Sequence, residues 1–391
     1  MSTFRKLMKP LLAVALTAAL LPAATVSAAQ PAEQAGVASP ATDQVMIKVK
    51  PGQTGADIAA KHGAKVKKNL SKAGYQVLKV QAGQSAEELL AKLQGDPAVE
   101  AAELDAVYSV NFTPNDPSFA SQWHLTKIQA PQAWDYVIGS GVTIAIIDTG
   151  VDIQHPDLSS KIVAGYDFVN DDTNADDDQG HGTHVAGIAA ASFNNGLQGA
   201  GVAPGARIMP VKVLNAAGSG YTSDIIDGLY FAADNGAKVI NFSLGGGAYS
   251  STFQTAVNYA WSKGSVVVAA AGNNGNTAVQ YPAGYSNVFS VACTTSADAK
   301  CSFSTYGTWV DIAAPGQSIY ATANGGGMTT MSGTSMSAPV VSGVAALVWQ
   351  DQGISGTPST VVNKICSSAD KISGTGTYWI CGRVNAYRAV M

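Results

Sequence analysis

The segment Gly333-Thr334-Ser335-Met336-Ser337-Ala338-Pro339 leads into a nearly unbroken apolar run, Val340 to Trp349. Small residues recur in this run at helical spacing, which predicts a buried helix that packs closely against its neighbours. A hydroxyl at the start of such a helix usually serves only as an N-cap. The same position would also suit a nucleophile, because helix-start N–H groups and the helix dipole favour nearby negative charge. Ser335 is therefore a candidate nucleophile if the chain supplies a base and a group that orients it.

Two further segments supply these groups. The apolar run from Thr143 to Ile147 is typical of a strand buried on both faces, and it ends at Asp148. A carboxylate at the end of a buried strand costs free energy unless it has a partner. The candidate partner is His181, which opens another apolar helix in the sequence GHGTHVAG. Asp148, His181 and Ser335 follow one another in the order that the triad residues have in subtilisin.

A fourth segment follows the predicted strand from Val266 to Ala271 and reads Gly272-Asn273-Asn274-Gly275. Acyl transfer develops an oxyanion, and a side-chain amide is a suitable donor to it. Asn-Gly clusters usually only make turns. In the company of the other three motifs, we favour Asn273 as an oxyanion donor.

The chain resembles the subtilisin-type serine proteases, and within them the thermitase-like subgroup. The resemblance covers roughly residues 112–391 and is carried by IAIIDTGVDIQHPDL, GHGTHVAGIAA, NFSLGG, VVVAAAGN and GTSMSAP. It implies that Asp148, His181 and Ser335 form the triad and that Asn273 completes the oxyanion hole. His181 would take the proton of Ser335 as the hydroxyl attacks a peptide carbonyl, while Asp148 holds the imidazole tautomer.

The chain divides into three predicted parts. Residues 1–29 have a basic start, a short apolar stretch and small-residue cleavage sites, as a secretory signal does. That stretch is too short for a membrane anchor. Residues 30–111 begin with a linker and continue as strand–helix–strand, then helix–strand, which predicts an α+β sandwich. This part resembles the inhibitory propeptide of secreted subtilisins, and we expect the precursor to process itself near its end.

The third part, residues 112–391, alternates apolar strand runs with helical patterns. This alternation predicts an α/β fold with a doubly wound, mostly parallel sheet whose site lies at the strand carboxyl ends. The expected strands are 143–147, 208–213, 239–243, 266–271 and 289–292.

The composition argues against two classes of protein, nucleic-acid-binding proteins and membrane-spanning proteins. The formal net charge of −4 argues against nucleic-acid binding, and no segment after the signal has the pattern of a membrane span. All glutamates lie before residue 112. This difference in composition is consistent with a precursor that is cut into two parts. We expect a secreted, extracellular, monomeric endopeptidase that acts on proteins and peptides, with its own propeptide as an intramolecular inhibitor.

Substrate contacts are expected at two segments that lack bulky side chains. In the resembled family these segments sandwich an extended substrate by strand addition, although ordinary turns are the alternative. Small residues at the end of the 266–271 strand and directly after it would leave a roomy apolar pocket, which implies broad specificity with an apolar or aromatic preference. The segments are Gly218, Ser219 and Gly220 and Ser243, Leu244, Gly245 and Gly246, and the pocket residues are Ala270, Ala271 and Gly272.

Calcium is the expected cofactor, with a structural role. The stretch from Asp167 to Asp178 is dense in Asp and Asn, and oxygen ligands suit a hard cation. A run of charges is usually only a solvated loop, but the family resemblance favours calcium. The acidic-loop set is Asp167, Asp172, Asn174 and Asp176, and the amino-terminal set is Asp116, Asp157 and Asn195 with the carbonyls of Ser192, Leu197 and Gly199.

The four cysteines are close in sequence as two pairs, Cys293 with Cys301 and Cys366 with Cys381. In a secreted chain they predict two disulfides with these local pairings, although four cysteines allow three connectivities. A zinc site does not fit the spacings. The pair His181 and His184 also lacks the glutamate that a zincin helix requires, so His184 is expected to be a core residue.

A catalytically silent binding module and a dedicated processing protease are the alternatives to a secreted endopeptidase of broad specificity. A catalytically silent homologue that acts as a binding module would lack a triad residue or Asn273, and all four are present. A processing convertase would carry an acidic specificity pocket and a further domain, which we do not expect here.

Overall fold

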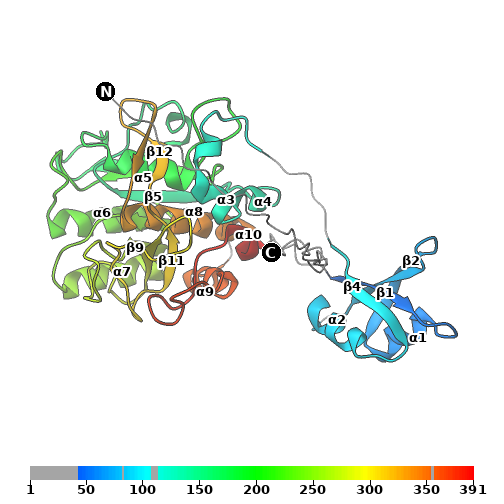
Figure 1. Cartoon of the computed structure of the whole chain (residues 1–391). Coiled ribbons are helices and arrows are strands. Elements are labelled where there is room, and N and C mark those ends of the chain that lie inside the picture. Colours follow the sequence, from blue (N-terminus) through cyan, green and yellow to red (C-terminus); the bar gives the residue numbers. More distant parts are fainter. Residues whose placement is uncertain (1–42, 82, 107–112, 354–355) are drawn as a thin grey trace, which may run out of the picture. The chain divides into compact units, whose positions relative to one another are not determined.

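The computed structural model describes residues 43–81, 83–106, 113–353 and 356–391. The chain divides into two compact units (Figure 1). The N-terminal unit comprises the described residues up to 106, and the second, from residue 113 on, is named the catalytic unit because the predicted triad residues belong to it. The predicted signal, the linker after it and residue 111, near which processing is expected, lie outside the described residues. Among the residues that are described, no helix is long and apolar enough to cross a membrane.

The N-terminal unit is a four-stranded antiparallel sheet with two helices. Apolar side chains of the sheet and of both helices form its core, among them Leu78, Ile58 and Leu89. The second helix starts with the predicted capping box, in which the Ser85 side chain accepts from Glu88 N–H and the Glu88 side chain accepts from Ser85 N–H. The elements are β1 (Gln44–Val49), α1 (Gly55–Lys61), β2 (Ala64–Leu70), β3 (Tyr75–Val80), α2 (Ala86–Gln94) and β4 (Val99–Leu104).

The N-terminal unit has one strand more than the sequence predicted. The order in the sheet is β2-β3-β1-β4, so β2 is an edge strand. Its sequence, AKVKKNL, shows no apolar alternation, and most of its side chains are exposed. Lysines on an exposed edge discourage pairing with another chain, and they also removed the pattern by which a strand is normally recognised.

The catalytic unit is built on a seven-stranded sheet with the order β11-β10-β9-β8-β5-β7-β6. All its strand pairs are parallel, which confirms the predicted doubly wound α/β fold. The strands are β5 (Thr143–Asp148), β6 (Tyr166–Asp167), β7 (Arg207–Lys212), β8 (Val239–Phe242), β9 (Val266–Ala270), β10 (Val288–Thr294) and β11 (Ile312–Pro315). A separate antiparallel hairpin consists of β12 (Ile319–Thr322) and β13 (Met328–Met331).

Helices cover both faces of this sheet (Figure 1). Alternate residues of β5 show the two layers: Ile144 and Ile146 pack in the core with α5 and α8, whereas Ala145 and Ile147 pack in the core with α6 and α7. The helices are α3 (Trp123–Lys127), α4 (Ala130–Ala133), α5 (His181–Ala190), α6 (Thr222–Asp234), α7 (Ser251–Ser262), α8 (Thr334–Asp351), α9 (Pro358–Ser368) and α10 (Ala386–Val390), with 3-10 turns at Phe119–Ser121 and Ser159–Lys161.

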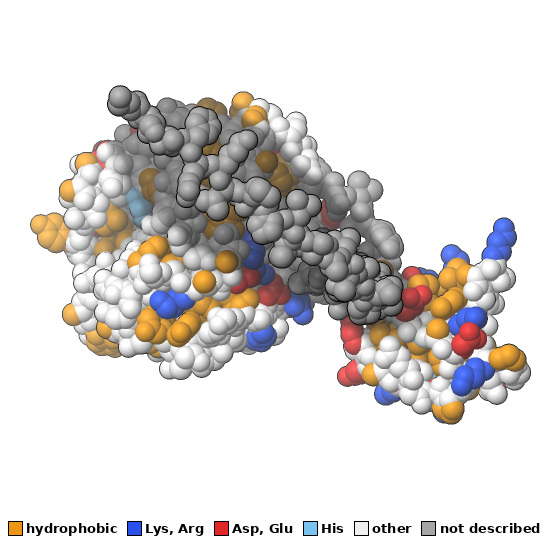
Figure 2. Space-filling model, viewed as in Figure 1, with side chains coloured by type: hydrophobic (Ala, Val, Ile, Leu, Met, Phe, Trp, Pro, Cys, Tyr) orange, Lys and Arg blue, Asp and Glu red, His pale blue; other side chains and the backbone are white. Residues whose placement is uncertain are grey.

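Charged side chains are sparse on the visible face of the catalytic unit and denser on the N-terminal unit (Figure 2). This distribution agrees with the sequence, in which lysines and all glutamates are concentrated before residue 112.

Candidate active site

The four residues of the predicted catalytic machinery lie at strand ends and helix starts of the catalytic unit. Asp148 is the last residue of β5, and Asn273 lies in the loop after β9. His181 is the first residue of α5, and Ser335 is the second residue of α8. The parallel strands β5, β8 and β9 are neighbours, so their carboxyl ends meet at one edge of the sheet.

Asp148 and His181 form a hydrogen-bonded pair. Nδ1 of His181 lies 2.7 Å from Oδ1 of Asp148, whose side chain is fully buried. Burial of the ring disfavours the imidazolium, but the charge and hydrogen bond of Asp148, with a smaller contribution from the charge of Asp177, outweigh burial and raise the pKa of His181. With Nδ1 turned to the carboxylate, Nε2 is the ring nitrogen available for proton transfer.

Ser335 and Ser243 exchange hydrogen bonds, and Ser243 directly follows β8, the neighbour of β5 in the sheet. The Ser335 hydroxyl donates to the Ser243 carbonyl at 3.0 Å, and the Ser243 hydroxyl donates to the Ser335 carbonyl at 2.7 Å. Pro339 explains the second bond: it has no N–H for the carbonyl four residues earlier, which is that of Ser335. Among the described residues no hydrogen bond joins Ser335 Oγ to His181, and a rotation about χ1 would redirect the hydroxyl.

The geometry around Gly333 suits an oxyanion. Oδ1 of Asn273 accepts from the backbone N–H and the hydroxyl of Thr334, at 2.9 and 3.0 Å, so the amide nitrogen is turned the other way. A Cβ placed on Gly333 would lie 3.5 Å from Asn273 Nδ2 and 3.6 Å from the backbone nitrogen of Ser335. Two nitrogen donors and the Met336 sulfur, at 3.8 Å, therefore surround the position where a Gly333 side chain would be, an arrangement compatible with an oxyanion hole.

A cleft of about 650 Å³ opens beside His181. Both predicted substrate segments line it, together with the apolar and aromatic residues Leu214, Phe253 and Tyr281. The predicted pocket residues are not among its lining residues. Ala271 packs instead in a core cluster with Trp379, because its side chain points to the opposite face from that of Ala270. The lining residues from the two segments are Gly218, Ser219, Gly220, Ser243, Leu244, Gly245 and Gly246.

Comparison with known proteins agrees with this geometry. A model of the subtilase family matches residues 139–382. Thermitase from Thermoactinomyces vulgaris is 57% identical over 280 residues, which are 71% of this chain and 99% of that protein. The chain belongs to the subtilase family. It is a serine endopeptidase of that family.

Other relatives extend the subtilase assignment. The thermophilic serine proteinase of Bacillus sp. (strain AK1) is 48% identical over 321 residues, covering 82% of this chain and 79% of the relative. A solved protease structure from Pseudoalteromonas arctica matches with a TM-score of 0.67 and 38% identity, over 71% of this chain and 99% of that one. A model of the fervidolysin N-terminal prodomain matches residues 26–105, so this subtilase carries a prodomain.

One residue of the subtilase site was not predicted from sequence. Asp177 is buried, and its carboxylate accepts hydrogen bonds from the Thr149 hydroxyl and from both the N–H and the hydroxyl of Thr183. It also accepts from the backbone N–H groups of Gln179 and Gly180. Asp177 therefore joins the residue after Asp148 to the first turn of the helix that begins at His181. Asp177 lies only four residues before His181 in the sequence. It was nevertheless interpreted only as part of the acidic stretch from Asp167 to Asp178.

The amino-terminal calcium set is brought together in the structure. The carboxylates of Asp116 and Asp157 are both buried, and both contact Asn195: its N–H donates to Asp116 at 3.1 Å and its Nδ2 to Asp157 at 3.0 Å. Neither carboxylate forms a salt bridge within the described part of the chain. Leu197 and Gly199 lie on the same loop, where the Gly199 N–H donates to Asp157. All four carboxylate oxygens accept hydrogen bonds from residues 194, 195 and 199, so a cation would share them with these donors. Two buried carboxylates without a cationic side chain are compatible with such a cation.

The acidic-loop set also has no salt bridge to any residue that the structure describes, and it differs in that its side chains share no common partner. Both carboxylate oxygens of Asp167 accept from donors of residues 169 and 170. Asp172 accepts from the Asn174 N–H, and Asp176 accepts from the N–H of Ile153. These side chains have separate partners rather than a common one. Across the described residues, no three His, Cys, Asp or Glu side chains cluster as metal ligands, so any calcium must also use carbonyl and amide oxygens.

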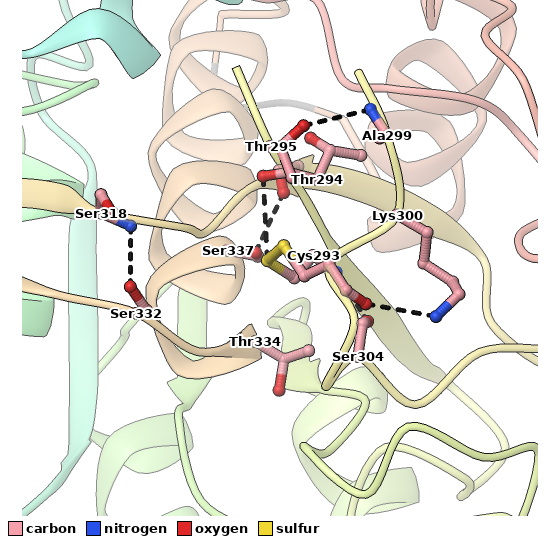
Figure 3. Close-up of a disulfide and its surroundings, with 12 residues drawn as sticks. Cys293, Thr294, Thr295, Ala299, Lys300, Ser304, Ser318, Ser332, Thr334 and Ser337 are labelled. Carbon is pink, nitrogen blue, oxygen red and sulfur yellow. Dashed lines mark hydrogen bonds between the residues drawn. A yellow bond between two sulfur atoms is a disulfide. The ribbon is translucent and has the colours of Figure 1, made fainter. Parts of the chain in front are cut away.

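The remaining predicted features lie in the core. His184 is buried, and its Nε2 lies 3.2 Å from the carbonyls of Ile319 and Thr329, as expected of a core residue. The structure joins Cys293 to Cys301 and Cys366 to Cys381, which are the expected local pairings. The first disulfide lies close to the helix that carries Ser335 (Figure 3).

Proposed function

We propose that this chain is the precursor of a secreted, extracellular serine endopeptidase of broad specificity. Residues 1–29 are the secretory signal, 30–111 the linker and inhibitory propeptide, and 112–391 the catalytic domain. The observation that carries the proposal is the convergence at one sheet edge: the Asp148–His181 hydrogen bond and the two N–H donors beside Gly333.

In the proposed reaction, the Ser335 hydroxyl turns from the Ser243 carbonyl toward His181 and attacks the peptide carbonyl. His181 accepts the proton, and Asp148 stabilises the imidazolium that results. Asn273 Nδ2 and the Ser335 N–H donate to the oxyanion. The loss of one such donor costs about 3–4 kcal/mol, a value measured in subtilisin itself.

The substrate is a protein or peptide bound in extended form. Gly218–Gly220 and Ser243–Gly246 offer backbone groups on the same cleft, which supports strand addition on both sides of the substrate. The apolar and aromatic residues Leu214, Phe253 and Tyr281 in that cleft support a preference for apolar or aromatic side chains. The catalytic unit acts as a monomer.

Calcium stabilises the folded enzyme at the amino-terminal set. Asp116, Asp157 and Asn195 would hold the ion, with the carbonyls of Ser192, Leu197 and Gly199. A cation there would relieve the repulsion of two buried carboxylates and tie the segment of Asp116 to the loop that follows α5.

Ser335→Ala tests the proposed function. The variant should not hydrolyse casein, and it should accumulate as an unprocessed precursor, because self-cleavage uses the same site. Ser332→Ala, which removes a hydroxyl two residues before Thr334, is the matched control and should retain both activities. Casein hydrolysis by pure Ser335→Ala would refute the nucleophile, and a precursor that stays intact as wild type would refute autoprocessing. Substrate binding without turnover by the wild-type chain would instead favour a silent binding module.

A further inference from the structure

The Cys293–Cys301 disulfide joins strand β10 to the loop that follows it. Cys293 lies in β10, opposite Ala314 of β11, and both cysteines are fully buried. The Cys301 N–H donates to the Cys293 carbonyl, and the Ser304 hydroxyl accepts from the Cys293 N–H. Figure 3 shows the disulfide close to Ser337, in the first turn of α8.

The chain directly after Cys301 holds the loop that carries Asn273. The Thr305 N–H donates to the Gly272 carbonyl at 2.9 Å, and the Gly275 N–H donates to the Phe303 carbonyl at 2.7 Å. The Thr305 hydroxyl also accepts from the Asn274 N–H at 3.3 Å. Both flanks of Asn273 are therefore attached to the segment that the disulfide anchors.

The other half of the disulfide lies against the turn that carries Ser335. A Cβ placed on Gly316 would be 2.8 Å from Cys293 Sγ and 2.7 Å from the Gly333 carbonyl oxygen. The Gly333 N–H donates to the Gly316 carbonyl at 2.9 Å. Gly316 thus lies between the Cys293 sulfur and the residue that precedes α8, and the absence of a side chain permits this close approach.

We propose that Cys293 and Cys301 are positioning residues for the oxyanion hole. The two oxyanion donors belong to different segments, the loop after β9 and the start of α8. Thr334 joins these segments through its hydrogen bonds with Asn273 and Gly272, and the disulfide supports the outer side of both. The disulfide contacts the segments that hold both donors, and it keeps the position of one donor constant relative to the other. This inference rests on the proposed function, because it takes Asn273 and the Ser335 N–H as the donors. Misplacement by about 1 Å at a reacting group can cost on the order of 100-fold in rate.

The second disulfide provides an internal control. Cys366 belongs to α9, and the backbone of Cys381 hydrogen-bonds to the Asp311 carbonyl and the Lys371 amine. In the described parts of the chain, these bonds reach no segment that carries a triad residue or Asn273. Removing this disulfide tests what the loss of any cross-link does to the enzyme.

The experiment compares Cys293→Ala/Cys301→Ala with Cys366→Ala/Cys381→Ala, each normalised by active-site titration so that only folded sites are counted. We expect kcat on a peptide substrate to fall about tenfold or more in the first variant, with KM changed less than about twofold. A peptide aldehyde, whose adduct places an oxyanion in the hole, should lose affinity by a similar factor. The acid limb of the pH profile should stay in place, because the Asp148–His181 pair is untouched. The control variant should keep kcat within about twofold.

A kcat within twofold of wild type for the first variant, or equal losses in both double variants, would overturn the inference. If the first variant does not fold, Thr305→Val carries the test: it keeps the disulfide, removes the acceptor for the Asn274 N–H, and should lower kcat and aldehyde affinity together. Unchanged values for a folded Thr305→Val variant would then refute the positioning role. Failure of the proposed function would appear separately, as casein hydrolysis by Ser335→Ala.

Discussion

Ser243 and Ser335 bind each other through two hydrogen bonds, one from each hydroxyl to the other residue's backbone carbonyl. The bond to the Ser335 carbonyl replaces the helical bond that Pro339 cannot make. The turn that carries Ser335, the proposed nucleophile, is thereby attached to the strand end that lines the cleft.

Ser243→Ala should destabilise the enzyme, because it leaves the Ser335 carbonyl without its donor in a partly buried place. The expected loss is about 1–3 kcal/mol. Urea unfolding should be measured in the Ser335→Ala background, which prevents autolysis. Ser262→Ala removes an exposed helix hydroxyl that also bonds to a carbonyl, and it should cost less than about 0.5 kcal/mol. Equal effects of the two substitutions would contradict this account.

Asp177→Asn should change the pH profile of catalysis. The charge of Asp177 is one of the influences that raise the pKa of His181, so its removal should lower that pKa. Because the reaction needs neutral His181, the acid limb of kcat/KM should move to lower pH. The exposed carboxylate of Asp135 gives the matched control, Asp135→Asn, which should leave the limb in place. A shift of the limb to higher pH in Asp177→Asn would exclude the proposed electrostatic contribution.

Calcium removal should lower the thermal stability and speed autolysis. Binding to the folded state alone stabilises by about 2.7 kcal/mol when calcium is at 100 times its dissociation constant. Asp116→Asn with Asp157→Asn should abolish the difference in melting temperature between chelator and millimolar calcium. Asp167→Asn with Asp172→Asn, in the acidic-loop set, should leave most of that difference. The reverse pattern would move the calcium site to the acidic loop.

Acid should unfold the enzyme partly through two buried histidines. Burial lowers the pKa of His124 to about 3 and that of His184 to about 4, and in His124 the nearby His184 adds to the effect. These groups take up protons on unfolding, so the free energy of unfolding should fall as pH drops below about 6.5, by up to about 1.4 kcal/mol per pH unit for each histidine.

His124→Leu isolates one of these groups. Its free energy of unfolding should depend less steeply on pH between about 4 and 6 than that of the parent, whatever its absolute stability. Urea unfolding at several pH values in the Ser335→Ala background measures the slope. An unchanged slope would show that His124 does not contribute to acid unfolding.

The sequence predicted the central sheet well because its strands are buried on both faces and therefore read as unbroken apolar runs. It found β5 and β9 nearly to the residue, together with the polar residues that follow them. The edge strands β2, β6 and β11 were not predicted. β6 has two residues and β2 is rich in lysine, so neither carries an apolar pattern, and β11 is buried but only four residues long.

In the candidate site too, residues within contiguous motifs were predicted, whereas the surroundings of Asp177, which other segments supply, were not. Asp148, His181 and Ser335 each lie within a contiguous motif, and the structure brings their segments together. The environment of Asp177 depends on donors from Thr149 and Thr183, which an acidic stretch does not reveal. Likewise, the side chain of Ala271 was expected in the cleft, but strand alternation turns it into the core.

The lysine-rich strand β2 gives the sheet of the N-terminal unit two unlike edges. On one side, positively charged side chains repel an identical copy of the same strand. On the other side lies β4, whose sequence VEAAEL carries acidic instead of basic residues. Two copies of the N-terminal unit that met through matching edges would therefore repel each other, whereas a β2 edge and a β4 edge carry opposite charges over the described residues.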